Sequence, residues 1–237
     1  MSGHSHWHSI RHKKELEDAK RGRIFSKLAR AIEVAAREGG DPAKNPKLRQ
    51  SLEEAKKFNI SKENIERAIK RGTGELEGKK LEEVSYEIFG PYGITLIIEG
   101  ITDNKNRSLN EIKQIIQKGG GKLAEPNSIK WMFEKRGVIT IIQIKEKEEL
   151  EILAIEAGAE DIRWQNEMLE IYTKPEELEK VKNFLENKGI EIESASLDWI
   201  PKEEVSLKEK EKIVVEKFFE TLDENEAIQN IFSNLKI

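Results

Sequence analysis

The sequence predicts an α+β multidomain protein, with an N-terminal three-helix domain followed by two ferredoxin-like α+β domains, the last inserted in the middle one. Apolar residues recur every three or four positions as far as Gly72, as on helices, and every second position in segments after Leu81, as on strands. The segments 208–222 and 227–232 read as one helix and one strand. Neither can bury its apolar face alone, so both must return to an earlier domain.

Residues 1–75 are predicted to form a helical domain preceded by an extended arm. Residues 1–12 are polar and have no apolar period, whereas a helical pattern begins near residue 13. Start and stop signals then delimit three helices joined by short connections, at Gly39-Gly40, Asn45-Pro46, Ser61 and Gly72. The glycine-rich and charged stretch that follows, 72–80, is the expected linker.

The chain from 81 onward predicts the two α+β domains. In the middle domain, assigned to 81–135 plus 206–237, we expect strands at 84–89 and 94–99, a helix after Thr102 and a strand near 129–133. The domain at 136–200 has the order strand, helix, strand, strand, helix, strand, which is the ferredoxin-like unit. Because the middle unit lacks one helix and one strand, the C-terminal elements are predicted to complete it.

Composition limits the possible functions. The net charge is only −4, but residues 1–80 (the head) hold twenty basic and twelve acidic side chains, whereas residues 81–237 (the body) hold twenty-one and thirty-three. The chain has no cysteine, which excludes disulfides and thiolate chemistry. With no signal-like or membrane-spanning apolar run, we expect a cytoplasmic protein. No catalytic motif occurs and no histidine follows residue 12, so we predict no catalytic residue, no metal and no cofactor.

The first candidate site is the N-terminal arm, whose composition suits nucleic acid. Its cations can neutralise phosphates, and its indole can stack on a base. One alternative is a solvated terminus without a ligand. Another is a metal site made by His4, His6 and His8, although no carboxylate or cysteine lies among them. The arm residues predicted to bind nucleic acid are His4, Trp7, Arg11, His12, Lys13 and Lys14.

The second candidate site is a basic stripe on the first helix. Steps of three and four residues place its cations on one face, and like charges at this spacing repel by about 0.2–0.5 kcal/mol per pair. We interpret the stripe as a surface for phosphates, with an ordinary solvated helix face as the alternative. Together with an adjacent arginine, the stripe comprises Lys20, Arg21, Arg23, Lys27 and Arg30.

A secondary anion or partner contact is predicted in the middle domain. Asn104 precedes a helix and is first of all a capping residue, but that helix start and Arg107 could also meet an anion. Tyr92 lies in a hairpin turn, where it would be exposed. The run Gly119-Gly120-Gly121-Lys122 is not a P-loop, because it follows a helix and no serine or threonine comes after the lysine.

A series of motifs also occurs in a characteristic order along the chain. They are Gly3-His4-Ser5-x-Trp7, Asp18-Ala19-Lys20-Arg21-Gly22-x-x-Phe25-x-Lys27, Gly39-Gly40-x-Pro42-x-x-Asn45-Pro46, Asn64-Ile65-Glu66-Arg67-Ala68-Ile69, Thr102-Asp103-Asn104-x-Asn106-Arg107 and Glu156-Ala157-Gly158-Ala159-Glu160-Asp161. The series resembles the YebC family over nearly the whole chain. It departs from the family pattern at His6, at Tyr92 and at Glu125-Pro126-Asn127.

The resemblance implies three domains without known catalytic activity, and two competing roles. Bacterial members are named probable transcriptional regulators, whereas the mitochondrial relatives are translational activators of cytochrome c oxidase. Related members are linked to ribosomes, where they are thought to relieve stalling at proline runs. We therefore expect a non-enzymatic, nucleic-acid-binding regulator of gene expression, with DNA, ribosomal RNA or transfer RNA as the partner. A protein partner on the acidic body and a histidine-ligated metal protein are the alternatives from other classes.

Overall fold

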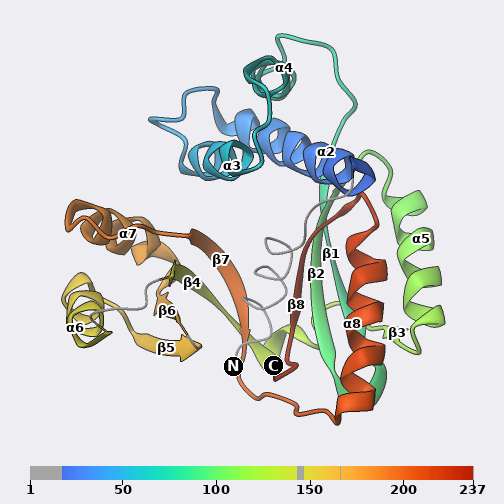
Figure 1. Cartoon of the computed structure of the whole chain (residues 1–237). Helices are drawn as coiled ribbons and strands as arrows, with labels where there is room; N and C mark the ends of the chain where they lie inside the picture. Colours follow the sequence, from blue (N-terminus) through green and yellow to red (C-terminus); the bar gives the residue numbers. More distant parts are fainter. Residues whose placement is uncertain (1–17, 143–146, 166, 237) are drawn as a thin grey trace.

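The computed structural model describes residues 18–142, 147–165 and 167–236, which form a helical head and two β-sheet bodies (Figure 1). The head lies across one end of both bodies, with helix α2 above the first sheet and helix α3 facing helix α7 of the second. This arrangement confirms the predicted fold class of a helical region followed by two antiparallel sheets. No helix in the described ranges is long and apolar enough to cross a lipid bilayer.

The head consists of helices α2 (Asp18–Ala35), α3 (Pro46–Lys57) and α4 (Lys62–Gly72), with a 3₁₀ turn η1 (Ala36–Glu38) after α2. The predicted caps are present: the side chain of Asn45 accepts from Leu48 N at 3.0 Å, and that of Ser61 accepts from Asn64 N at 3.4 Å. The three helices enclose their own apolar core, whose fully buried members include Ile32, Leu48 and Ala55.

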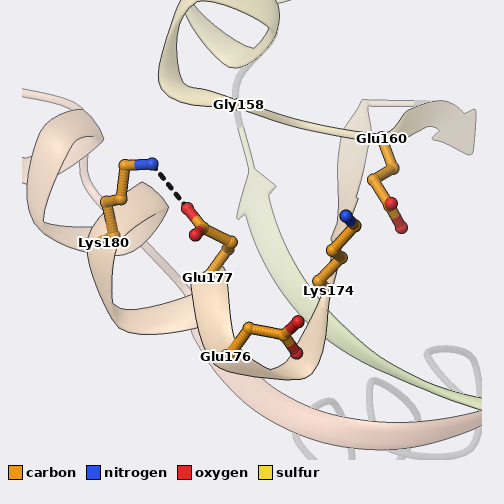
Figure 2. Close-up of a pocket in the computed structure, with 6 residues that line it drawn as sticks. All are labelled: Gly158, Glu160, Lys174, Glu176, Glu177 and Lys180. Atoms are coloured by element: carbon orange, nitrogen blue, oxygen red, sulfur yellow. Dashed lines mark hydrogen bonds and ion pairs between the residues drawn. The ribbon is translucent and has the colours of Figure 1, made fainter.

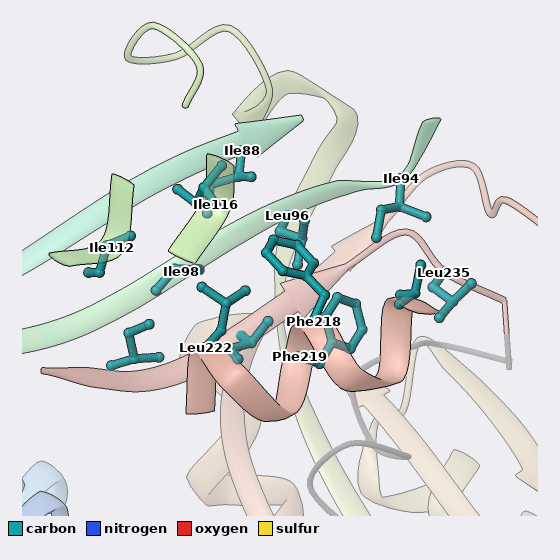
Figure 3. Close-up of a cluster of buried hydrophobic side chains, with 13 residues drawn as sticks. Ile88, Ile94, Leu96, Ile98, Ile112, Ile116, Phe218, Phe219, Leu222 and Leu235 are labelled. Atoms are coloured by element: carbon teal, nitrogen blue, oxygen red, sulfur yellow. The ribbon is translucent and has the colours of Figure 1, made fainter. Parts of the chain in front are cut away.

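The first sheet has the order β3-β1-β2-β8, from strands β1 (Glu82–Phe89), β2 (Thr95–Thr102), β3 (Lys122–Leu123) and β8 (Ile228–Ser233). Helices α5 (Lys105–Lys118) and α8 (Glu209–Asp223) cover one face. Figure 3 shows Phe218, Phe219 and Leu222 of α8 directed at the isoleucines of the sheet. The C-terminal helix and strand thus complete the first sheet, because burial against it is what removes their apolar faces from water.

The second sheet has the order β5-β6-β4-β7, from β4 (Phe133–Ile142), β5 (Asp161–Gln165), β6 (Met168–Thr173) and β7 (Ser194–Pro201). Helices α6 (Lys147–Ala157) and α7 (Leu178–Asn187) pack on one face, and 3₁₀ turn η4 (Pro175–Glu177) precedes α7. Its chain order is the predicted ferredoxin-like one. The first sheet is also four-stranded and antiparallel, but its chain order is strand, strand, helix, strand, helix, strand.

One predicted strand, at 129–133, is wrong. Residues 130–132 form the 3₁₀ turn η3 (Lys130–Met132), and Phe133 already belongs to β4 of the second sheet. The buried carboxylate of Glu87 on β1 accepts hydrogen bonds from three main-chain amides of residues 127–130, which holds this segment in a loop. The edge strand of the first sheet is the short β3 instead.

Candidate nucleic-acid interface

Several predicted contact residues lie outside the described part of the chain. They are His4, Trp7, Arg11, His12, Lys13 and Lys14, together with the alternative metal ligands at positions 4, 6 and 8. The structure describes the backbone of Lys20, on the first turn of α2, but not its side chain. Arg21 is exposed and has no ion-pair partner among the described residues. The arm therefore remains a prediction, and Arg21 is the described cation nearest to it in sequence.

The remaining cations of the basic stripe face the turn between α8 and β8. The Lys27 ammonium donates to the main-chain oxygen of Asp223 at 2.5 Å and to its Oδ1 at 2.9 Å. Arg30 donates to the main-chain oxygen and to Oε2 of Glu226, both at 2.8 Å. Arg23 lies 3.6 Å from a carboxylate oxygen of the intervening Glu224. The anionic partner of this stripe is thus, at least in part, the C-terminal region of the same chain.

Electrostatics explains why this turn attracts cations. Asp223 is the last residue of α8, and the final carbonyl groups of a helix carry a partial negative charge that cations stabilise. Lys27, only 2% exposed, adds its ammonium to that helix end. The prediction that Lys27 contacts phosphate is therefore wrong for this conformation, because its ammonium is enclosed and already hydrogen-bonded. Arg23 and Arg30 remain partly exposed, so they are only partly engaged.

The head also contacts the second sheet through polar groups. Arg49 of α3 forms an ion pair with Glu179 of α7 at 2.8 Å, and Gln50 donates to Ala195 O of β7 at 2.6 Å. The buried Lys182 of α7 donates to Glu53 at 2.6 Å. Charged groups at the head surface therefore hold it against both bodies, while each apolar core is built largely within its own unit.

The start of α5 forms a second charged cluster. Asn104 is the cap, since its side chain accepts from Arg107 N at 3.1 Å. Arg107 also donates to Asp103, and Lys79 of the linker donates to the same carboxylate at 2.7 Å. The hydrogen bond from Lys79 lowers the pKa of Asp103 below its usual value, and the charge of Arg107 lowers it further. The capping role predicted for Asn104 is thus present, and Arg107 is half exposed beside it.

The structure connects Arg107 with the stripe on α2 but separates it from Tyr92. Glu111 lies 3.8 Å from Arg107 and accepts from Asn225, which belongs to the turn that holds the stripe. Tyr92 is exposed in turn η2 (Pro91–Gly93), at the opposite end of the β1–β2 hairpin. Strand β2, which runs between the two ends, has eight residues and so spans about 25 Å at roughly 3.3 Å per residue. The secondary contacts predicted from the sequence therefore do not form one site.

Sequence reasoning missed the exposed cations on the remaining head surface. Two of them, Arg37 and Arg71, lie near Glu33. Burial raises the pKa of Glu33, and the charges of Arg71 and Arg37 offset only part of that rise. Four exposed lysines have no ion-pair partner among the described residues, namely Lys44, Lys56, Lys62 and Lys70. The signal was present for three of them, because the apolar positions of α3 and α4 leave Lys56, Lys62 and Lys70 on the outer faces, whereas Lys44 lies in the connection before α3.

No described group resembles a catalytic or metal centre. Within the described ranges, no cluster of three or more histidine, aspartate or glutamate residues could hold a metal ion. Figure 2 shows a shallow depression between the end of α6 and η4, where Lys180 turns toward Glu177 at 2.6 Å. Its other lining residues are Gly158, Glu160, Lys174 and Glu176, and the three charged ones among them are exposed to solvent.

Comparison with known proteins gives the family. The model described as the TACO1/YebC protein N-terminal domain matches residues 5–75, and the model described as the TACO1/YebC second and third domain matches 81–235. The chain belongs to the TACO1/YebC family. The resemblance inferred from the motifs is thus confirmed, and the two matched segments meet at the linker.

Relatives in the TACO1/YebC family match over the whole chain. A probable transcriptional regulatory protein of Persephonella marina is 49% identical over 241 residues, covering 100% of this chain and 96% of the relative. One of the same description from Thermoanaerobacter pseudethanolicus is 46% identical over 240 residues, covering 100% and 98%. The crystal structure of a conserved hypothetical protein from Aquifex aeolicus has a TM-score of 0.86 and 43% identity, covering 95% and 94%.

Proposed function

We propose that this chain is a non-enzymatic nucleic-acid-binding regulator of gene expression that binds phosphates through its head. The observation that carries the proposal is that cations of the head remain exposed after its internal ion pairs are formed. Arg21 stands near the start of α2, where the basic arm joins. Three exposed lysines lie on the other two helices, and Lys44 lies in the connection before α3. The names of the bacterial relatives support a role in transcription.

The proposed phosphate contacts combine the predicted arm with the start of α2. They comprise the arm residues Arg11, Lys13 and Lys14 with Lys20 and Arg21 on α2, while Trp7, His4 and His12 would contact bases or sugars. Arg23 and Arg30 would join only by exchanging their glutamates for phosphate. Such contacts fix the position of nucleic acid but carry no sequence information, so we expect weak intrinsic sequence specificity.

Salt-dependent binding tests the proposal. Affinity for a fluorescein-labelled DNA duplex and for a ribosomal RNA fragment is measured between 50 and 200 mM KCl, and log Kd should depend linearly on log salt concentration. The double variant Lys14→Glu with Arg21→Glu should weaken binding strongly and reduce the slope by about one for each lost phosphate contact.

A matched control changes charge elsewhere in the chain. Lys113 is exposed on α5 of the body and has no ion-pair partner within the described ranges, so Lys113→Glu alters the net charge as much as Arg21→Glu does. It should leave affinity within about twofold. The proposal fails if Arg21→Glu and Lys113→Glu weaken binding equally, since net charge would then explain the binding.

A separate experiment distinguishes DNA from the ribosome as the target. A lysate is sedimented through a sucrose gradient with and without ribonuclease. A role in transcription predicts that the chain stays near the top of the gradient in both cases. Co-migration with ribosomes that ribonuclease abolishes would favour the translational alternative. If the head variant, which should no longer bind nucleic acid, still binds a protein from the lysate, that partner contacts the acidic body.

A further inference from the structure

Trp131 lies in the connection between the two sheets and is far more exposed than a tryptophan normally is. It is 67% exposed, the highest value among the large apolar side chains of the described residues. Its indole Nε1 donates to the main-chain oxygen of Ser128 at 2.8 Å. The polar edge of the ring is therefore held by the protein, while most of its surface faces solvent.

The loop that carries Trp131 is fixed rather than loosely attached. The carboxylate of Glu87, on the neighbouring strand β1, accepts from the amides of Asn127, Ile129 and Lys130 at 2.6, 2.6 and 3.1 Å. Ile129 is fully buried, and Lys202 N donates to Met132 O at 2.9 Å. A ring held this way loses little conformational entropy when a ligand binds, which is how affinity is gained by preorganisation.

Two ammonium groups lie in the same region. Lys130, next to Trp131 in sequence, has its Nζ 5.8 Å from the ring centroid of Trp199. Lys135 on β4 has its Nζ 5.5 Å from the same centroid. The Trp199 indole donates to Glu99 at 2.8 Å, which holds this second ring in place. The two ammonium groups, on residues one and four positions from Trp131 in sequence, are thus each held by a contact with the fixed ring of Trp199.

We propose that Trp131 is a stacking platform for an unpaired nucleobase, with Lys130 and Lys135 close to the adjoining phosphates. A single exposed indole beside ammonium groups has the chemistry of sequence-tolerant binding to single strands, where each base offers a flat face. The core of a protein-docking surface is depleted of charge, whereas the exposed residues near Trp131 in sequence include the charged Glu125, Glu134 and Lys135.

The proposal rests on the proposed function and deepens it, because it names the class of nucleic acid. Bases in a duplex are already stacked on one another and have no face to offer. A contribution from Trp131 therefore requires unpaired bases, as in the loops of a folded RNA. The platform lies in the body and is separate from the phosphate contacts proposed for the head.

The test compares one variant on two probes. Fluorescence anisotropy measures the Kd for a labelled twelve-nucleotide single-stranded RNA and for a twelve-base-pair DNA duplex, at one salt concentration. Trp131→Ala should weaken binding to the single strand by about 5- to 150-fold, the loss typical of one stacked base. Binding to the duplex should change less than twofold. Trp131→Phe, which keeps a flat ring, should retain most of the affinity for the single strand.

Controls separate this proposal from the proposed function and from misfolding. Ile155 on α6 is 65% exposed, so Ile155→Ala removes a comparably exposed apolar group elsewhere and should affect neither probe. The proposal is overturned if Trp131→Ala changes single-strand affinity less than twofold, or weakens both probes equally. Unchanged binding in the Arg21→Glu variant would instead reject the proposed role of the head and leave the result at Trp131 standing.

Discussion

The ion pair between Lys27 and Asp223 should be strongly coupled, since it joins the first described helix to the end of α8. Lys27 is 2% exposed, whereas the Asp223 side chain is 29% exposed. Removing one partner of a fully buried ion pair costs about 3–5 kcal/mol. Asp223 is partly solvated, and its main-chain oxygen still accepts from Lys27 in a variant. We therefore expect Asp223→Ala to lower the stability of this contact by about 1–3 kcal/mol.

The reciprocal change should cost less. Lys27→Met keeps the apolar stem and removes the charge, leaving a carboxylate that water can reach, so its cost should stay below about 1 kcal/mol. The double variant should resemble Lys27→Met alone. A double-mutant cycle then gives a coupling energy close to the cost of Asp223→Ala itself, about 1–3 kcal/mol. The cycle also cancels any separate effect of removing a negative charge from the C-terminal turn of α8.

Native-state hydrogen exchange of the α2 amides measures this coupling. A local method is required because a three-body chain need not unfold in one transition. Glu224 provides the matched comparison: its contact with Arg23 is 3.6 Å long and exposed, so Glu224→Ala should cost less than about 0.5 kcal/mol. Additive effects of Lys27→Met and Asp223→Ala would refute the reasoning, as would equal losses for Asp223→Ala and Glu224→Ala.

Three further predictions concern other parts of the chain. Burial raises the pKa of Asp198 on β7 to about 7, so the folded state holds this proton more tightly than the unfolded state and stability should fall as pH rises from about 4 to 7. Because Asp198 is only half-buried, about 1–3 kcal/mol is expected, measured as a drop in the urea midpoint between pH 5 and pH 8 that Asp198→Asn reduces. Glu87→Gln should lower the free energy of unfolding in urea by about 2–4 kcal/mol, since an amide cannot accept from three main-chain groups as a carboxylate does. The control Glu83→Gln, at an exposed position on the same strand, should be nearly neutral. Equal effects of the two changes would contradict the role of the Glu87 carboxylate. Gly72→Ala would place its Cβ 2.3 Å from a main-chain oxygen of α2 and should lower the melting temperature. At Gly22, a Cβ would meet no described atom within 4 Å beyond its chain neighbours and its own helix backbone, so Gly22→Ala should raise stability by about 0.5–1 kcal/mol. A stabilised Gly72 variant would show that its packing can relax.

Local sequence patterns predicted the elements where one short-range signal dominates. The caps Asn45, Ser61 and Asn104 each satisfy a helix amide three residues away, so their effect is visible in the sequence. The segment 129–133 has the apolar residues of a strand, but Glu87, about forty positions earlier, holds it as a loop. No local pattern contains that information, because the decisive hydrogen bonds join segments brought together by folding.

The sequence alone determined the class of protein: a basic helical head on an acidic body, the order of helices and strands, the return of the C-terminal elements and the family. These depend on periodicity, composition and motifs, which are properties of the chain itself. Only the tertiary structure decided how the cations are used. Lys27 is enclosed at the end of α8 by a residue 196 positions away, whereas Arg21, one helical turn and a half earlier, remains exposed. Their charges are identical in the sequence, and the difference arises because burial and the nearest anion are set by contacts between distant segments.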